Sequence, residues 1–152
     1  MSIDTDPNRA EAEERLLTSS AGRALLEQVQ AMPRPGVREI ARWRKSWGAE
    51  SVSAALDLTA ARIAARGKFP SAEELWLTPQ GVEQSTSWRI AEQKAGRFGS
   101  SPVIDLCSGL GNDARALARR GPTVAVDRSW GMCRRLVWNA RVWGVSSSVL
   151  AV

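Results

Sequence analysis

The sequence predicts an α/β protein in which a helical N-terminal domain precedes part of a doubly wound parallel sheet. Up to residue 100, apolar residues recur at helical spacing between short breaks rich in proline, glycine and serine. After Pro102, short apolar runs alternate with helical segments in the order β-α-β-α-β, which predicts right-handed crossovers and about three parallel strands. We therefore expect a helical domain over residues 1–100 and the first half of a sheet domain over residues 101–152.

The helical domain contains several helix starts with serine or threonine caps. Helices are expected over residues 9–17, from Ser19 or Ser20 to 32, over 37–47, and from Ser51 or Ser53 to 66. Residues 71–74 (SAEE) have the form of a capping box, which predicts another helix start. Thr78 and Pro79 suit the cap and first position of a helix that is expected to run to Arg97.

The sheet elements follow a break at residues 99–102 (GSSP). Residues 103–107 (VIDLC) form an apolar run interrupted by Asp105, which predicts a parallel strand covered on both faces. Further elements alternate between helix and strand. They are expected from Asn112 or Asp113 to 120, over 123–127, from Ser129 to Gly144, and over 149–152. The last strand would lie at an open sheet edge, so we expect marginal stability and low solubility.

The composition limits the chemistry of the chain. It contains no histidine and no tyrosine, which excludes Ser-His-Asp triads and histidine metal sites, and no metal is expected. Cys107 and Cys133 are too few for a disulfide framework, and both lie in expected core elements. The acidic N-terminus lacks a signal segment, and no apolar run is long enough to cross a membrane. A cytoplasmic protein with reduced thiols is therefore expected.

The net charge of +5 is typical of nucleic-acid-binding proteins, although scattered arginines also arise from biased genome composition. Residues 42–47 (RWRKSW) mix basic and aromatic side chains, as in proteins that bind single strands. Trp43 and Trp47 are about one helical turn apart, however, so that packing of this helix face is the favoured alternative.

The most informative segment is residues 105–114 (DLCSGLGNDA), where a strand leads into a glycine loop and a helix. Gly109, Gly111 and Ala114 fit the G-x-G-x-x-A pattern of dinucleotide sites, and Asp127 follows roughly 20 residues later. In such a site Asp105 would face a pyrophosphate. At a separation of ~4–5 Å, this repulsion costs on the order of several kcal/mol at an effective dielectric constant near 20.

A positively charged nucleoside cofactor reverses the sign of this interaction. S-adenosylmethionine carries an ammonium and a sulfonium group and no phosphate, so a carboxylate at the end of the first strand attracts it. The charge argument therefore favours S-adenosylmethionine over NAD. A turn that binds no ligand is the third alternative, although a buried Asp105 needs a polar partner that the turn does not supply.

Residues 103–144 resemble class I S-adenosylmethionine-dependent methyltransferases, whose sheet is Rossmann-like. Residues 105–111 match the glycine-rich first motif, with Cys107 where many members have glycine. Residues 124–127 (VAVD) match the acid of the second strand, and residues 139–140 (NA) match a recurrent pair in the next helix. Three upstream stretches resemble an actinobacterial subgroup with an N-terminal helical domain and a C-terminal THUMP-like domain. They are residues 68–70 (KFP), 77–86 (LTPQGVEQST) and 95–98 (AGRF).

The resemblance implies roles for seven residues in cofactor binding. Gly109 and Gly111 would let the methionine part of the cofactor approach the loop. Asp105, the acid of the first strand, would lie near the amino group of the cofactor, and Asp127, the acid of the second strand, would bind its ribose. Cys107 is small enough to leave the loop open, with a simple core thiol as the alternative. Gln84 and Ser85 belong to the element that lies over the cofactor's carboxylate in related enzymes. The alternative is that these polar side chains only cap the helix or face solvent.

The function implied is an S-adenosylmethionine-dependent methyltransferase, with RNA as the acceptor class suggested by charge and family together. The later strands, the acceptor loop and the THUMP-like domain are not in the sequence, so we expect a truncated form, with a partner chain as one source of the missing half. No catalytic residue is identified. Three alternatives stay open: an inactive remnant or pseudoenzyme, a fragment of an NAD-dependent oxidoreductase, and a basic helical nucleic-acid-binding module.

Overall fold

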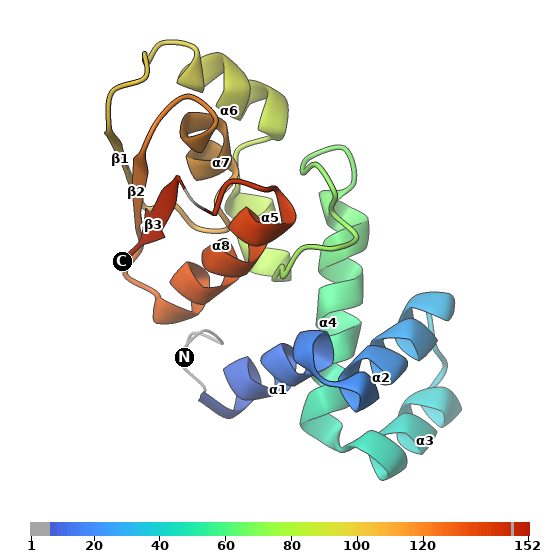
Figure 1. The fold of residues 1–152 in the computed structure, drawn as a ribbon. Helices are drawn as coiled ribbons and strands as arrows, with labels where there is room; N and C mark the ends of the chain where they lie inside the picture. Colours follow the sequence, from blue (N-terminus) through green and yellow to red (C-terminus); the bar gives the residue numbers. More distant parts are fainter. Residues whose placement is uncertain (1–6, 147) are drawn as a thin grey trace. The chain divides into compact units, whose positions relative to one another are not determined.

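The computed structural model describes residues 7–146 and 148–152 (Figure 1). The chain divides into two compact units, one ending at Ala61 and the other beginning at Arg62. This boundary falls within a helix, whereas the sequence predicts a domain boundary near residue 100. Residues 62–100 group with the sheet because they make hydrogen bonds and apolar contacts with the helices that flank it.

The first unit is formed by helices. They are α1 (Pro7–Thr18), α2 (Ser20–Ala31), α3 (Val37–Trp47) and most of α4 (Ala49–Ala65). α1 and α2 pack so closely that a Cβ atom at Gly22 would lie 2.1 Å from the carbonyl oxygen of Arg15. Ser19 caps α2, since its hydroxyl oxygen accepts a 2.9 Å hydrogen bond from the amide of Gly22. The expected helices of this unit are thus present, with a serine cap on the second.

The start of α4 differs from the prediction, which placed it at Ser51 or Ser53. Gly48 ends α3 with a φ of 83°, and its amide donates to the carbonyl oxygen of Arg44 at 3.0 Å. The carbonyl oxygen of Gly48 accepts the amide of Val52 at 3.2 Å. One glycine thus both ends α3 and accepts the first hydrogen bond of α4, which begins at Ala49, before either predicted serine.

The second unit carries the sheet. Its elements are α5 (Pro79–Gln84), α6 (Trp88–Ala95), β1 (Val103–Leu106), α7 (Asn112–Ala118), β2 (Thr123–Val126), α8 (Trp130–Val142) and β3 (Val149–Ala151). The strands lie in the order β1-β2-β3, and both pairs are parallel. The register aligns Ile104 with Val124 and Val124 with Leu150. None of the described helices combines the length and the apolar character that a membrane span requires.

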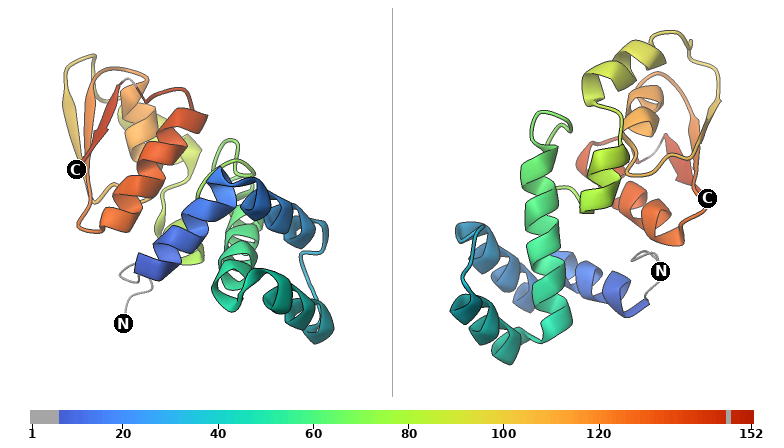
Figure 2. Two further views of the ribbon diagram at one scale, coloured as in Figure 1. Left: turned by 60° about the horizontal axis from the view of Figure 1, so that its bottom comes forward. Right: turned by 180° about the vertical axis from the view of Figure 1, so that it is seen from behind.

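One face of the sheet is covered by α7 and α8 (Figure 2). Ala114 and Leu136 from these helices pack on Ala125 of the central strand. α6 packs in turn on α7 through small side chains, mainly alanines, which allow the two helices to approach closely. The glycine loop between β1 and α7 therefore starts from a well-packed side of the sheet.

The opposite face of the sheet is bare within the described residues, so the expectation of a first strand covered on both faces is wrong. Ile104 and Leu106 are 64% and 71% exposed, and Leu150 of β3 is 60% exposed. The apolar run is real, but its side chains alternate between the covered face and solvent. We call Ile104, Leu106 and Leu150 the bare sheet face.

Two helix predictions upstream of the sheet are also wrong. Residues 71–74 form a turn rather than a helix, and Ser71 has a φ of 54°. The helix expected from Thr78 to Arg97 is broken into α5 and α6, because Ser85 and Ser87 have extended backbone conformations. This break frees the carbonyl oxygen of Thr86, which accepts a hydrogen bond from Asn112.

Candidate functional site

The glycine loop connects β1 to α7 at the carboxyl edge of the sheet. The amide of Ser108 donates to the carbonyl oxygen of Val126 at 3.0 Å, which continues the strand pairing into the loop. The amide of Gly111 then donates to the carbonyl oxygen of Ser108 at 3.0 Å. Gly109 and Gly111 have φ angles of 54° and 94°, in the left-handed region that favours glycine.

The two glycines have different surroundings. A Cβ atom at Gly111 would lie 2.9 Å from Cγ of Leu136, so this glycine lets α8 pack against the loop. A Cβ atom at Gly109 would meet nothing within 4 Å. Gly109 is therefore the position at which the loop backbone faces open space, where a ligand can approach it.

Cys107 also has a left-handed backbone, with a φ of 62°. A residue with a side chain is strained in this conformation, which suits the glycine that many members of the resembled family carry here. Cys107 is exposed, whereas Cys133 is buried. The alternative that Cys107 is a simple core thiol is therefore wrong, and its contact with a ligand stays a prediction.

Asp105 is the charged residue of β1. Its Oδ2 atom is buried and has no hydrogen-bond partner among the described residues. Burial, followed by the nearby Asp113 carboxylate, raises the pKa of Asp105 to about 6, although the Lys94 ammonium acts in the opposite direction. The structure thus places a carboxylate in a setting where a cationic partner would stabilise its charged form.

Asp127 follows β2 and binds the loop directly. Its Oδ2 accepts a 2.9 Å hydrogen bond from the amide of Gly109, and its Oδ1 accepts a 2.9 Å bond from the amide of Ser129. The carboxylate thereby fixes both the glycine loop and the start of α8. Each oxygen keeps a further lone pair, so that hydroxyl donors can still bind.

Lys94 and Asp113 form an ion pair beside the loop that the sequence analysis did not assign. Lys94 Nζ lies 2.7 Å from Asp113 Oδ1 and donates to Thr86 Oγ1 at 3.5 Å. Lys94 belongs to the last turn of α6, and its side chain reaches back toward the start of that helix, as helical side chains do. The break between α5 and α6 would have indicated this arrangement, but the sequence predicts one continuous helix there.

Two buried asparagines tie the segment before the sheet to the loop. Asn139 of α8 is 0% exposed, accepts the amide of Trp76 at 2.8 Å, and donates to the carbonyl oxygens of Trp76 and Leu110, each at 3.2 Å. Asn112 donates to the carbonyl oxygens of Lys68 and Thr86 at 3.0 and 2.8 Å. We call Asn112 and Asn139 the asparagine clamps. Both lie in segments that the sequence indicated, but these hydrogen bonds were not predicted for either.

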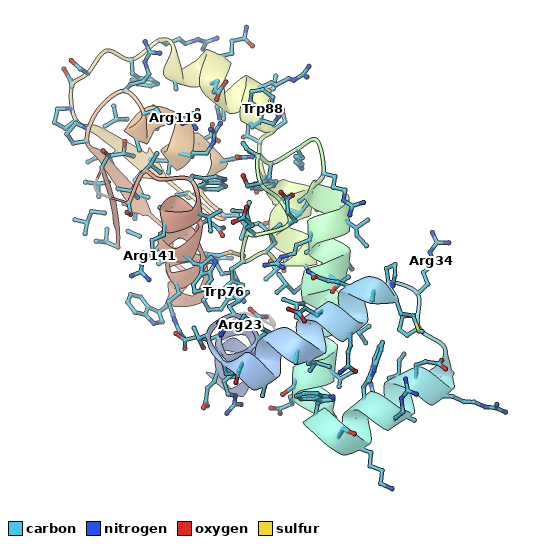
Figure 3. All side chains as sticks on the ribbon, turned by 45° about the vertical axis from the view of Figure 1, so that its right-hand side comes forward. Arg23, Arg34, Trp76, Trp88, Arg119 and Arg141 are labelled. Atoms are coloured by element: carbon cyan, nitrogen blue, oxygen red, sulfur yellow. The ribbon has the colours of Figure 1, made fainter. Side chains whose placement is uncertain are left out.

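Aromatic and basic side chains reinforce the contact between this segment and α8. Trp76, which lies beside α8 (Figure 3), makes an edge contact with Trp138 at a centroid distance of 6.4 Å. The guanidinium group of Arg135 lies 5.5 Å from the centroid of Trp76. Trp143 Nε1 donates to the carbonyl oxygen of Pro70 at 3.0 Å. Trp138 of α8 and Trp143, directly after α8, therefore hold the preceding segment in place.

Gln84 and Ser85 lie at the end of α5. The Ser85 hydroxyl donates to the carbonyl oxygen of Gly81 at 2.6 Å, so it ends the helix, and Gln84 is exposed. Gly81 contacts the glycine loop, since a Cβ atom there would lie 2.8 Å from Cδ1 of Leu110. The structure thus places α5 against the loop and brings Asp105, Gly109 and Asp127 to the loop itself. Ligand contacts of Gln84 and Ser85 stay a prediction.

Comparison with known proteins identifies a structural relative. No protein-family model matches this chain, and no curated protein matches it. Its structure is similar to the crystal structure of a "putative methyltransferase" from Porphyromonas gingivalis W83, with a TM-score of 0.67 and 17% sequence identity. The similarity covers 92% of this chain and 35% of that chain. It confirms the predicted α/β fold, in which helices precede a partial Rossmann-like parallel sheet.

Proposed function

We propose that this chain binds S-adenosyl-L-methionine at the glycine loop, as part of a methyltransferase. The observation that carries the proposal is the buried Oδ2 atom of Asp105, which lacks a hydrogen-bond partner among the described residues. A buried carboxylate oxygen without a partner is costly, and a cationic donor is the partner that stabilises it most. The similarity to the Porphyromonas gingivalis structure supports the proposal at the level of the fold.

The residues at the loop fit the parts of this cofactor. The ammonium group suits Asp105, and the ribose hydroxyls suit the remaining lone pairs of Asp127, whose carboxylate also holds the amide of Gly109. The open space at Gly109 admits the methionine part. When bound, the cofactor supplies a methyl group that its sulfonium centre already activates. The chain's own contribution is then to orient the cofactor and to fix the loop around it.

The charges beside the loop argue against NAD. The carboxylates of Asp113 and Asp127 both act on Asp105, and Lys94 is the cation that acts on it. A pyrophosphate would add negative charge to a site where carboxylates already outnumber the ammonium group. An NAD-dependent oxidoreductase is therefore the weaker alternative.

Methyl transfer itself is a proposal about a larger assembly, since this chain spans about a third of the Porphyromonas gingivalis chain. We propose a further polypeptide, in the same chain or a partner, that covers the bare sheet face and supplies the acceptor site. A pseudoenzyme that binds the cofactor without transferring the methyl group is the alternative.

RNA is the acceptor class that we propose. α3 supports it with Arg38, Arg42 and Lys45, which are exposed and lie three or four residues apart along the helix. Arg34 extends from the turn before α3 into solvent (Figure 3). A basic module that binds nucleic acid without methyl transfer is the second candidate function on the same observation. If α3 contacts RNA, Arg42→Gln and Lys45→Gln together weaken RNA binding severalfold at low salt, which a filter-binding titration measures.

Titration calorimetry with S-adenosylhomocysteine and with NAD tests the proposed cofactor. We expect S-adenosylhomocysteine to bind and NAD to bind at least about tenfold more weakly, because of the carboxylates at the loop. Glu83→Gln is the matched control, since Glu83 is an exposed acid of α5 and should leave both affinities unchanged. Tighter binding of NAD, or binding of neither compound, would contradict the proposal.

A further inference from the structure

A cluster of Lys94, Thr86 and Asp113 places a positive charge near Asp105 of β1. Lys94 Nζ is held by Asp113 Oδ1 at 2.7 Å and reaches Thr86 Oγ1 at 3.5 Å. The Lys94 side chain is 46% exposed and that of Asp113 is 24% exposed. The ammonium group is therefore anchored on one side and accessible on the other.

The elements around the cluster fix its position relative to the loop. Thr86 precedes α6, and its carbonyl oxygen is bound by Asn112, the first residue of α7. Asp113 is the next residue of α7, directly after the glycine loop. Lys94 and Asp113 both act electrostatically on Asp105. A positive and a negative group thus stand side by side where the loop meets α7.

Such a pair of charges matches an amino-acid group better than a simple cation. A free α-amino acid carries an ammonium and a carboxylate on one carbon atom, so that an acid and a base in the protein can bind both at once. A ligand with the ammonium alone would be attracted by Asp105 but repelled by Lys94. The acidic residues explain the affinity for a cation, but they do not explain why an ammonium group of the protein lies among them.

We propose that Lys94, assisted by Thr86, binds the α-carboxylate of the ligand while Asp105 binds its α-ammonium group. The site then selects nucleosides that carry a complete amino-acid zwitterion. This inference rests on the proposed function, because it assigns a residue to one end of the same ligand. Asp113 is a positioning residue in this arrangement, since it holds the Lys94 ammonium in reach.

Three ligands, two variants of Lys94 and one control variant test the assignment by calorimetry on the full chain. The ligands are S-adenosylhomocysteine, its decarboxylated analogue with the amine retained, and 5′-methylthioadenosine, which lacks the amino-acid group. We expect the wild type to bind S-adenosylhomocysteine about tenfold more tightly than the decarboxylated analogue. Lys94→Met should lose about tenfold affinity for S-adenosylhomocysteine, whereas its affinity for the decarboxylated analogue should rise, because the repulsion by Lys94 is removed. Lys94→Arg should retain most of the affinity, and Arg97→Met, an exposed cation beyond α6, should change nothing.

The outcomes separate this inference from the proposed function. Equal affinities of the wild type for S-adenosylhomocysteine and its decarboxylated analogue would overturn the role of Lys94. Tighter binding of S-adenosylhomocysteine by Lys94→Met than by the wild type would also overturn it. Both results would leave the proposed cofactor site standing. Failure of the wild type to bind any of the three nucleosides would overturn the proposed function and the inference with it.

Discussion

The two faces of the sheet differ in what covers them. On one face, α7 and α8 bury apolar side chains, and the asparagine clamps bind backbone groups of the preceding segment. On the other, Ile104, Leu106 and Leu150 face solvent. The covered side contains the buried polar groups that shape the glycine loop, and the bare side contains apolar surface without a described partner.

This difference indicates that the glycine loop depends on the covered side of the sheet. The loop is held by hydrogen bonds with the end of β2, with Asp127 directly after it, and with Asn139 of α8. The bare sheet face adds no contact to the loop among the described residues, yet parallel sheets are normally buried on both faces. We therefore expect substitutions on the covered side to lower the free energy of unfolding far more than substitutions on the bare sheet face.

The largest effect is expected for Asn139→Ala on the covered side. This substitution leaves the amide and carbonyl of Trp76 and the carbonyl of Leu110 buried without their partner. We expect a loss of about 3 kcal/mol in the free energy of unfolding, from the desolvation cost of these groups. Urea denaturation followed by circular dichroism measures it, with Gln93→Ala, an exposed residue of α6, as the control. A loss below about 1 kcal/mol would show that the clamp is dispensable.

The pH dependence of ligand binding gives the next largest effect. Because burial and Asp113 raise the pKa of Asp105 to about 6, only about a tenth of this side chain is ionised at pH 5. The affinity for S-adenosylhomocysteine should therefore rise about tenfold between pH 5 and pH 7. The free energy of unfolding without ligand should change in the opposite direction and fall as the pH rises. A carboxyl group with a raised pKa in the folded state favours folding below its unfolded pKa, and this contribution is lost as the pH rises through about 6.

Calorimetric titrations at several pH values check this dependence. An affinity for S-adenosylhomocysteine that is constant from pH 5 to pH 7 would show that Asp105 does not bind the ammonium group in its charged form.

A smaller effect is expected at Cys107, which borders the loop. Its left-handed backbone is strained for a residue with a side chain and costs most for a β-branched one. Cys107→Val should lower the free energy of unfolding by about 1 kcal/mol. Cys107→Gly should change it by less than about 0.5 kcal/mol, because the strain that glycine relieves in the folded state is offset by the greater flexibility that it gives the unfolded chain. Thermal melts of both variants test this. Equal melting temperatures would mean that the strain is absent.

The smallest effect on stability is expected on the bare sheet face. Leu106→Lys exchanges one exposed side chain for another, so the free energy of unfolding should change by less than about 0.5 kcal/mol. Self-association should fall, because an exposed apolar face beside an open sheet edge favours aggregation. Light scattering at rising protein concentration measures this. Unfolding of the variant would show that Leu106 is covered in solution.

The sequence predicted the parts of this fold that depend on local pattern. Gly109 and Gly111 were predicted to lie on the loop after the first strand, and Asp105 and Asp127 at the first and second strands, because spacing along strand-loop-helix units determines where their residues lie. The order of helices and strands followed from periodicity in the same way.

Contacts between distant segments were not predictable from local pattern. The break between α5 and α6 depends on Asn112, which binds the carbonyl oxygen of Thr86 26 residues away. The hydrogen bond from Lys94 to the Thr86 hydroxyl follows from that break. The exposure of Cys107 and of Leu106 could not be predicted either, because an apolar run does not reveal which face is covered.

The measurement that tests the account most directly is the affinity of Asp105→Asn for S-adenosylhomocysteine at pH 7.5. The amide keeps the shape of the side chain and removes the negative charge, so we predict at least a tenfold loss of affinity without a fall in melting temperature. An affinity equal to that of the wild type would contradict the claim that the loop attracts a cationic nucleoside through this carboxylate.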